Sequence, residues 1–420
     1  EAVSVASQAG ALLAASEGSD AAADYLADAA SAVWASNFDT RAWTLVEQGL
    51  RYAGDRRDLT WALLADYDLQ RRDANDPDFP GIPLDVPERH EVSRMLFANA
   101  PSWVERGVFF LPSVVFESRE DAIDRARLIP QMLAYIAGEY TRALALANPL
   151  AAQCAARGQL GLAATILTVA ASCASALGNL DASCEALVRA TELAERIGNP
   201  PLLAFLLQAV PLEHAGIRGE GYGVFLPAID QLLAAETQEI RWAMAAVWTA
   251  AALVCAHEGR CDDALRAFHR VLPAIERAPG WAATYTVMTY LAIEVLWVLD
   301  RIDHIDLLER NLREKTLKPD FRYPHTDARL ALARLCGLTG RFEEARGWFD
   351  KARRVLDEQG ARPLRAIVDF DEAWMEVRRG RAADRERALA LLDAARGPFN
   401  SIGMPGWVRR ADELRQQIAR

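Results

Sequence analysis

The sequence predicts an all-α protein in which antiparallel helix pairs, recurring about every 40 residues, stack into a superhelical solenoid. The first observation is a regular spacing of candidate turns. Steps of 40 or 41 residues separate seven of them: Gly138, Gly178, Gly219, Gly259, Asp300, Gly340 and Gly380. The second is length, because 420 residues exceed one compact core, whereas a stack of helix pairs grows without one.

The third observation is the pattern of residue types after a turn, which is clearest after Gly340. A glycine can adopt the left-handed conformation that ends a helix. Ala345 and Ala352 then allow close helix contacts, and Phe349 fills the space between them. The same types recur in earlier units: Gly259, Ala264, Phe268 and Val271; Gly178, Leu187 and Ala190; Gly138 and Ala143. These units resemble tetratricopeptide repeats, and a 40-residue unit implies helices of roughly 16 to 18 residues.

Helices are also expected before the array. Val3–Ser16 and Asp20–Ala35 are amphipathic segments separated by a short turn that contains Gly18. A third helix is expected to run through Tyr52, and Asp58–Arg72 forms a fourth. We therefore assign residues 1–72 to N-terminal helical hairpins.

Prolines then interrupt the helical pattern. Pro77, Pro80, Pro83 and Pro87 cannot lie inside a regular helix, and a long irregular segment is often functional or a boundary. We assign residues 73–118 to a Pro-rich boundary loop with an irregular helical segment, and residues 119–420 to the tetratricopeptide-like array. The array has one further interruption, at Lys318–Pro324.

The composition argues against two classes of partner. A net charge of −11 provides no basic excess for nucleic acid, and no window reaches the roughly 18 uninterrupted apolar residues of a membrane span. The six cysteines show no CxxC pair and no metal-ligand spacing, which predicts small buried side chains in a cytoplasmic protein. The chain begins at Glu1 without a signal sequence, so we expect it to be part of a longer protein.

The sequence lacks the motifs that would indicate catalysis or a cofactor. It has no GxxxxGK(S/T) phosphate loop, and the glycine-rich stretch Gly216–Gly223 is better interpreted as an inter-helix loop. The six histidines form no HExxH motif. Asp369, Asp371 and Glu372 lie near Arg365, which favours a solvated, ion-paired helix face. We expect no enzyme activity, no cofactor and no metal site.

Binding is expected on an inner surface, which the first helix of each pair would line. The inward positions, counted back from each turn, hold aromatic and charged residues: Tyr135, Glu213, Tyr290, Glu294, Trp297, Asp327, Arg334, Phe370 and Trp374. Rings and opposed charges are groups that a small polar ligand or a peptide would contact. Glu294 and Arg334, on consecutive units, should lie in the same place beside Trp297. The alternative is that the rings only fill space between helices.

Four segments resemble parts of large bacterial signalling proteins. They are Asp73–Glu88, Glu309–Lys315 with Pro319–Pro324, Leu356–Val368 and Ile402–Trp407. In those proteins a C-terminal helical repeat array follows a STAND-type ATPase and a class III adenylate or guanylate cyclase domain, or another effector. The resemblance implies that such domains lie upstream and that the array regulates them. The helix pairs are more distantly similar to the sensor domain of a maltotriose-responsive transcription activator.

Three functions are compatible with these observations. We favour a non-catalytic sensor or protein-interaction region that regulates an upstream STAND ATPase or cyclase module in signal transduction. The alternatives are a stand-alone peptide-binding adaptor or scaffold, and an enzyme with a cryptic site. The expected partners are a protein or peptide, a small-molecule effector, and the upstream domains of the parent chain; neither nucleic acid nor membrane is expected.

Overall fold

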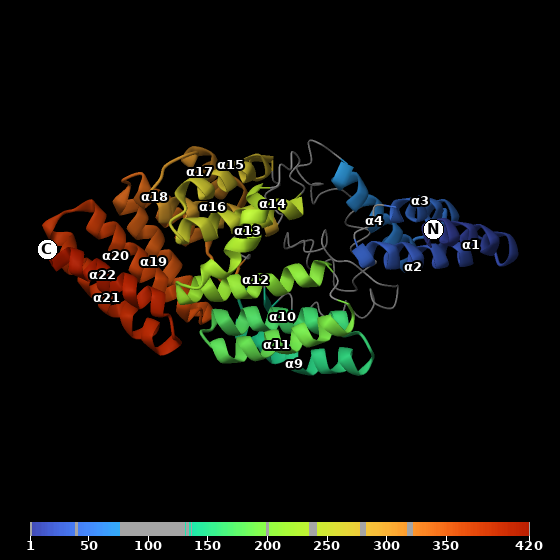
Figure 1. Cartoon of the computed structure of the whole chain (residues 1–420), viewed down its shortest axis with the longest axis horizontal. Coiled ribbons are helices and arrows are strands. Elements are labelled where there is room, and N and C mark those ends of the chain that lie inside the picture. The colour runs from blue at the N-terminus through green and yellow to red at the C-terminus, as the bar shows by residue number, and fades with distance from the viewer. Residues whose placement is uncertain are drawn as a thin grey trace.

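The protein is all-helical, as the sequence predicts. The computed structural model describes residues 2–37, 41–75, 131, 134–135, 137–198, 201–234, 242–277, 283–316 and 322–419 (Figure 1). These residues form eighteen α-helices and two short helical segments, and none of them lies in a β-strand. Their only β-type pairing is an isolated bridge between Tyr323 and Thr326. No helix in these ranges combines the length and the apolar character needed to cross a bilayer.

The first four helices have a hydrophobic core of their own. They are α1 (Ala2–Ser16), α2 (Ser19–Asn37), α3 (Ala42–Ala53) and α4 (Leu59–Asn75). Leu26, Leu45, Leu64 and Tyr67 are buried at the centre of this core, where consecutive helices pack against each other. The four helices expected from the sequence are confirmed, with α4 continuing three residues beyond the expected end at Arg72.

The remaining helices pack mainly against their neighbours in the chain (Figure 1). Their bounds are α9 (Tyr140–Ala156), α10 (Leu160–Ala176), α11 (Leu180–Arg196), α12 (Pro201–Arg218), η3 (Tyr222–Phe225), α13 (Leu226–Ala234), α14 (Trp242–His257), α15 (Cys261–Arg277), α16 (Ala283–Leu299), α17 (Ile305–Asn311), η4 (Leu312–Thr316), α18 (Ala328–Leu338), α19 (Phe342–Gln359), α20 (Arg362–Arg379), α21 (Ala382–Ile402) and α22 (Pro405–Ala419). Most are close to the predicted length of 16 to 18 residues.

All seven predicted turn positions have a left-handed backbone conformation. Six are glycines with φ between 70° at Gly219 and 80° at Gly178. The seventh, Asp300, has φ 52°, and aspartate is among the few other residues that adopt this conformation. Further left-handed glycines lie midway between predicted turns, at Gly158, Gly198 and Gly360. The chain therefore reverses where the glycine spacing indicates.

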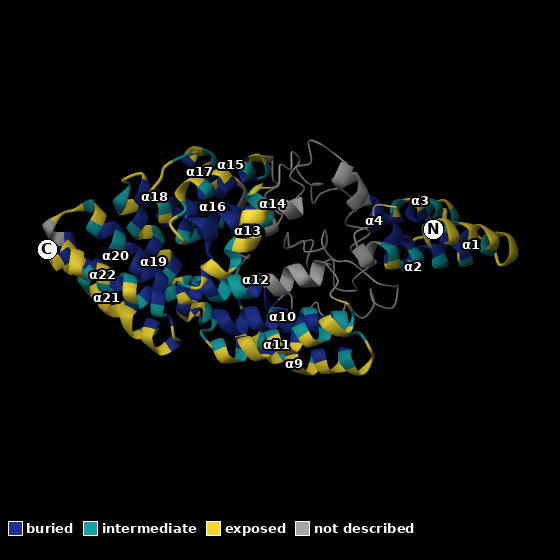
Figure 2. Cartoon of the chain, in the orientation of Figure 1, coloured by how far each residue is buried: buried dark blue, intermediate teal, exposed yellow. Residues whose placement is uncertain are grey.

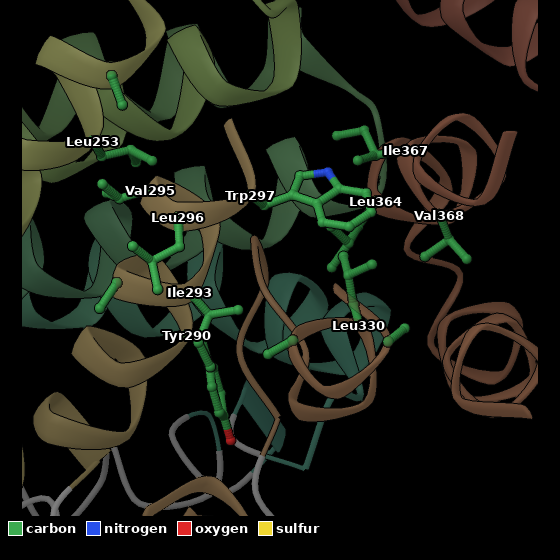
Figure 3. Close-up of a cluster of buried hydrophobic side chains, with 14 of the residues drawn as sticks. Leu253, Tyr290, Ile293, Val295, Leu296, Trp297, Leu330, Leu364, Ile367 and Val368 are labelled. Atoms are coloured by element: carbon green, nitrogen blue, oxygen red, sulfur yellow. The ribbon is translucent and has the colours of Figure 1, made fainter. Parts of the chain in front are cut away.

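The helices divide into two kinds according to burial (Figure 2). In α18, ten of eleven residues are buried, and α10 and α20 are buried around most of their circumference. By contrast, α19 buries only one stripe, which contains Ala345, Phe349, Ala352 and Leu356. A helix that is apolar all round belongs in the interior, whereas an amphipathic helix covers it. The buried helices meet in a shared core that includes Trp297 and Leu330 (Figure 3).

Replacing Ala345 by leucine tests this packing. Ala345 is fully buried at the contact of α19 with its neighbours, so the larger side chain should overpack the interface and lower the free energy of unfolding by about 1–3 kcal/mol. Gly347→Leu, two residues further along α19, is the matched control, because nothing lies within 4 Å of that position. Chemical denaturation of both variants should show the loss at Ala345 alone. Equal stability of the wild type and Ala345→Leu would contradict the assigned packing.

Two helices that are far apart in the chain, α12 and α22, also contact each other. The Trp407 indole N–H donates to the Gly216 carbonyl at 2.9 Å, across 191 residues of sequence. Gly406 lies so close to Gly219 that a β-carbon on it would be 2.3 Å from the Gly219 carbonyl oxygen. We call this the closure contact: residues 216–221, at the end of α12 and just after it, against residues 404–410, at the start of α22. It brings the start of α22 to the end of α14, where the candidate site lies.

The cysteine prediction holds for four of the six residues. Cys154, Cys173, Cys255 and Cys336 are buried, and all six are free thiols. Cys184 and Cys261 are exposed, because they lie near the starts of α11 and α15, on the side of these helices that faces solvent. For these two residues the prediction of burial is wrong.

Thiol reactivity should follow this division. The thiolate is the reactive form, and burial raises the pKa of Cys336 to about 12 and that of Cys173 further still. A chromogenic disulfide reagent should therefore modify two thiols rapidly in the native protein and all six after denaturation. Rapid modification of four or more thiols in the native protein would contradict this packing.

Several expectations lie outside the described residues. The Pro-rich boundary at 73–118 and the start of the array at 119 fall there, apart from the last turn of α4. So does most of the interruption at Lys318–Pro324. Its last residues, Arg322–Pro324, are described and lead into α18.

Candidate functional site

The nine side chains predicted to line an inner surface face other helices instead of open solvent. Six are buried, and three are partly buried: Glu213, Glu294 and Trp374. The reason is that α16, α18 and α20 pack directly on one another. The Trp297 and Trp374 rings meet edge to face with centroids 4.5 Å apart, and Phe370 is covered by Trp407 from α22 at 5.3 Å. Contact between these residues and a ligand would require helices to separate.

The structure divides the nine residues into separate groups. Glu294, Arg334 and Trp297 come together with Trp374 in the second half of the chain. Tyr135 and Glu213 belong to a different cluster, described below. Asp327 has a structural role: its carboxylate accepts hydrogen bonds from the backbone N–H groups of Arg329 and Leu330 and thereby caps α18. Tyr290 is buried in the core (Figure 3).

Arg334 is the centre of a buried ionic network. Its Nη1 donates to Glu294 Oε2 at 2.9 Å and its Nε donates to Asp371 Oδ2 at 2.8 Å. The Trp297 indole N–H donates to the other oxygen of Asp371 at 3.1 Å. The side chains of Arg334 and Asp371 are only 3% and 1% exposed, so solvent screens these interactions little. The expected proximity of Glu294 and Arg334 is confirmed.

The pKa values of the two carboxylates, Glu294 and Asp371, shift in opposite directions. Burial by itself would raise the pKa of Glu294, but Arg334 and His257 lower it to about 2. For Asp371, burial outweighs Arg334 and the Trp297 hydrogen bond and raises the pKa above its ordinary value. The guanidinium of Arg334 is held in its charged form, because both carboxylates raise its pKa.

The network continues from Glu294 to the closure contact through His257. Glu294 Oε1 lies 3.3 Å from His257 Nε2, and His257 Nδ1 lies 3.3 Å from Arg410 Nη2 on α22. Because a guanidinium can only donate, Nδ1 must accept, which assigns the imidazole proton to Nε2 and lets it donate to Glu294. The Tyr222 ring stacks on the imidazole at 4.4 Å. Burial lowers the pKa of His257, which favours this neutral form.

A cavity of about 280 Å³ opens to solvent above this end of the network. It is lined by the residues of the closure contact and the end of α14: Gly219, Glu220, Gly221, Tyr222, His257, Glu258, Gly406, Arg409, Arg410 and Glu413. Arg409 pairs with Glu220 at 2.6 Å, and the Arg410 guanidinium lies over the Trp407 ring at 4.8 Å. The cavity thus offers charges of both signs, with His257 linking it to the interior.

A second polar cluster joins the segment before α18 to α10 and α12. His325 Nε2 lies 2.8 Å from Glu213 Oε2, and Ser172 donates to the same carboxylate oxygen at 2.8 Å. Tyr323 donates to the other oxygen at 3.5 Å, and its ring meets Tyr135 edge to face. The same imidazole nitrogen faces both Glu213 and Ser172, so this is not the relay of a hydrolytic triad, in which the two partners use different nitrogens. The cluster holds Arg322–Asp327 against helices more than 100 residues away.

Sequence patterns missed several of these residues. His257, Asp371, Arg410 and His325 make contacts across 37 to 153 residues, which no short motif records. One signal was present: Glu294 and Arg334 occupy equivalent positions 40 residues apart. The acidic group Asp369, Asp371 and Glu372 is ion-paired as expected, but its predicted solvation is wrong, because all three are buried against arginines of α18, α19 and α21.

No protein-family model matches the chain, and a search of curated proteins finds no similar sequence.

Proposed function

We propose that this chain is a non-catalytic regulatory region, built as a tetratricopeptide-like solenoid, which senses a small polar effector or a protein partner and regulates an upstream STAND ATPase or cyclase module. The observation that carries the proposal is the cavity at the closure contact, because His257 and Arg410 connect it to the buried charges of three further helices. A ligand there would touch groups on which the packing of α14, α16, α18, α20 and α22 depends.

The fold supports the solenoid part of the proposal. Left-handed turns at the seven predicted positions are what a regular array of helix pairs requires. The small residues at the predicted close contacts, Ala264 and Ala345, are fully buried. The four segments that resemble bacterial signalling proteins support the link to an ATPase or cyclase, and with it a cytoplasmic location.

The size and charge of the cavity favour a small polar ligand. Sites for small molecules are typically about 300–1,000 Å³ and bury most of the ligand, so 280 Å³ suits a small molecule or one side chain of a partner. Glu258 and Glu413 would attract a cationic group, and Arg409 and Arg410 an anionic one. A ligand carrying both charges would match both sets.

The stand-alone adaptor is the weaker candidate. A peptide-binding array needs an open inner surface, whereas Tyr290, Trp297, Arg334 and Phe370 are buried between helices. An extended peptide could reach them only if α18 separated from α16 and α20. A sensor that changes helix packing fits this arrangement better than a permanently open groove.

The gene sequence upstream of this chain tests the proposed link to an ATPase or cyclase module. The coding sequence before the codon for Glu1 should encode a GxxxxGK(S/T) phosphate loop, followed by the rest of an ATPase domain. In the parent protein, nucleotide hydrolysis should change when residues 1–420 are deleted. An upstream region without a phosphate loop, or a hydrolysis rate unaffected by the deletion, would contradict the regulatory role.

Ligand binding is tested by thermal shift against amino acids, sugars and nucleotides. A ligand at 100 times its Kd stabilises a protein by about 2.7 kcal/mol. A ligand of the cavity should lose its effect in Arg409→Ala and Glu258→Ala, whose side chains are exposed, and keep it in Arg266→Ala on α15. A ligand that stabilises all three variants equally would bind outside the cavity.

A further inference from the structure

His257 lies between the charged interior and the closure contact, which joins the start of α22 to the end of α12. Its side chain is only 1% exposed, and it ends helix α14. One ring nitrogen faces Glu294 on α16, and the other faces Arg410 on α22. The neutral imidazole satisfies both neighbours, since it donates to the carboxylate and accepts from the guanidinium.

Protonation would reverse the second of these interactions. A proton on Nδ1 converts the acceptor that faces Arg410 into a donor, so two N–H groups would point at each other across 3.3 Å. It also places a second positive charge beside the guanidinium, and because the imidazole is only 1% exposed, their repulsion is screened less than that between two exposed charges. The Nε2 proton still donates to Glu294, and the positive charge strengthens that bond, so the change that weakens packing is confined to the Arg410 side.

We propose that the closure contact is a proton-sensitive latch: protonation of His257 repels Arg410 and releases the start of α22 from α12 and α14. The inference is independent of any effector bound in the cavity. Arg410 also donates to the Gly219 carbonyl at 3.3 Å and lies over Trp407, so its displacement removes three interactions of the contact together.

Burial and the charged groups near His257 together decide whether the pKa of its imidazole is raised or lowered. Glu294 favours the imidazolium, but it already pairs with Arg334, which together with Arg410 opposes it. Tyr222 stacks on the imidazole ring, and because its own pKa is raised, it stays neutral. Glu258 and Glu413 also line the cavity, and Arg409 and Glu220 form an ion pair there. Burial is the largest influence and lowers the pKa of His257.

A histidine with a lowered pKa in the closed form stabilises that form at neutral pH. The open form has an ordinary pKa near 6.5, so it binds the proton first as the pH falls. Opening should become more favourable by up to about tenfold per pH unit between 6.5 and the lower pKa of the closed form. The latch is therefore closed at neutral pH and opens in acid.

Hydrogen exchange of the whole chain tests the latch. We expect the peptides that cover residues 404–419 to lose protection between about pH 7.5 and about pH 5, by up to about tenfold for each pH unit below 6.5, after correction for intrinsic exchange rates. His257→Gln retains an N–H for Glu294 and an oxygen for Arg410 but cannot titrate, so it should keep protection at both pH values. His269→Gln, which alters an exposed histidine of α15, should behave like the wild type.

A second variant covers the case in which His257→Gln loses the contact at neutral pH. Arg410→Met removes the opposing cation, so it should open less with acid than the wild type does, whatever its protection at neutral pH. The proposal is overturned if residues 404–419 of the wild type are equally protected at both pH values. It is also overturned if His257→Gln, folded, or Arg410→Met shows the full acid response.

Discussion

Arg334→Ala should destabilise the protein by about 3–5 kcal/mol, one of the two largest effects expected of a single substitution in this chain. Removing the guanidinium leaves the carboxylates of Glu294 and Asp371 buried and without their cation. Asp371 is 1% exposed and cannot be hydrated without opening the contact of α18 with its neighbours, and an unpaired buried charge is costly. Glu294 is 15% exposed, so it should contribute the smaller part of the loss. Urea denaturation followed by circular dichroism measures the loss.

Arg378→Ala is the matched control. Arg378 also pairs with an aspartate, Asp300, but both side chains are substantially exposed to water. Exposed ion pairs contribute about 0–1 kcal/mol, so this variant should remain close to the wild type. Similar losses in the two variants, or a loss below about 1 kcal/mol for Arg334→Ala, would show that solvent reaches the network.

Trp407→Ala should also lower the free energy of unfolding by about 3–5 kcal/mol, and it should release α22. The indole ring lies between Phe370 and Phe399, with centroid distances of 5.3 and 6.0 Å, and its N–H donates to Gly216. Truncation removes this packing and one hydrogen bond of the closure contact together. Calorimetry should show the loss of stability, and limited proteolysis should cleave first within residues 404–419.

Trp348→Ala provides the comparison for this effect. Trp348 lies on α19, where its partly exposed ring contacts Lys351 and Arg313. The ring is only partly buried against the core, so a distinctly smaller loss is expected, and proteolysis at α22 should not change. If Trp407→Ala lost no more stability than Trp348→Ala, the closure contact would contribute little to the fold.

The local features of the fold could be predicted from the sequence. A left-handed turn depends on one residue and its immediate neighbours, so Gly138, Gly178, Gly259 and Gly340 could be identified by spacing alone. Close helix contacts at Ala264 and Ala345 follow from the same local pattern. The closure contact could not be predicted, because the approach of Gly406 to Gly219 depends on how rotations accumulate over all the intervening helices.

The candidate site was predictable only in part, for the same reason. Glu294 and Arg334 lie on consecutive helix pairs, and their pairing follows from the repeat. Arg410 reaches His257 from 153 residues away, which no repeat position implies. The rings of Trp297 and Phe370 were expected to face a groove, but Trp374 and Trp407 cover them. The inner face of a helix forms an open groove only if no later helix of the chain packs against it.

The central claim is that α22 packs against the turn after α12. A distance measurement by pulsed electron paramagnetic resonance tests it most directly. Spin labels would replace Glu220 and Arg409, whose side chains pair across the contact at 2.6 Å, with Cys184 and Cys261 changed to serine. At neutral pH we predict one narrow distribution of label-to-label distances, centred at short distance. In Gly406→Ala this distribution should broaden, because the added β-carbon collides with the Gly219 backbone. A broad, long-distance distribution in the otherwise unaltered chain would contradict the account.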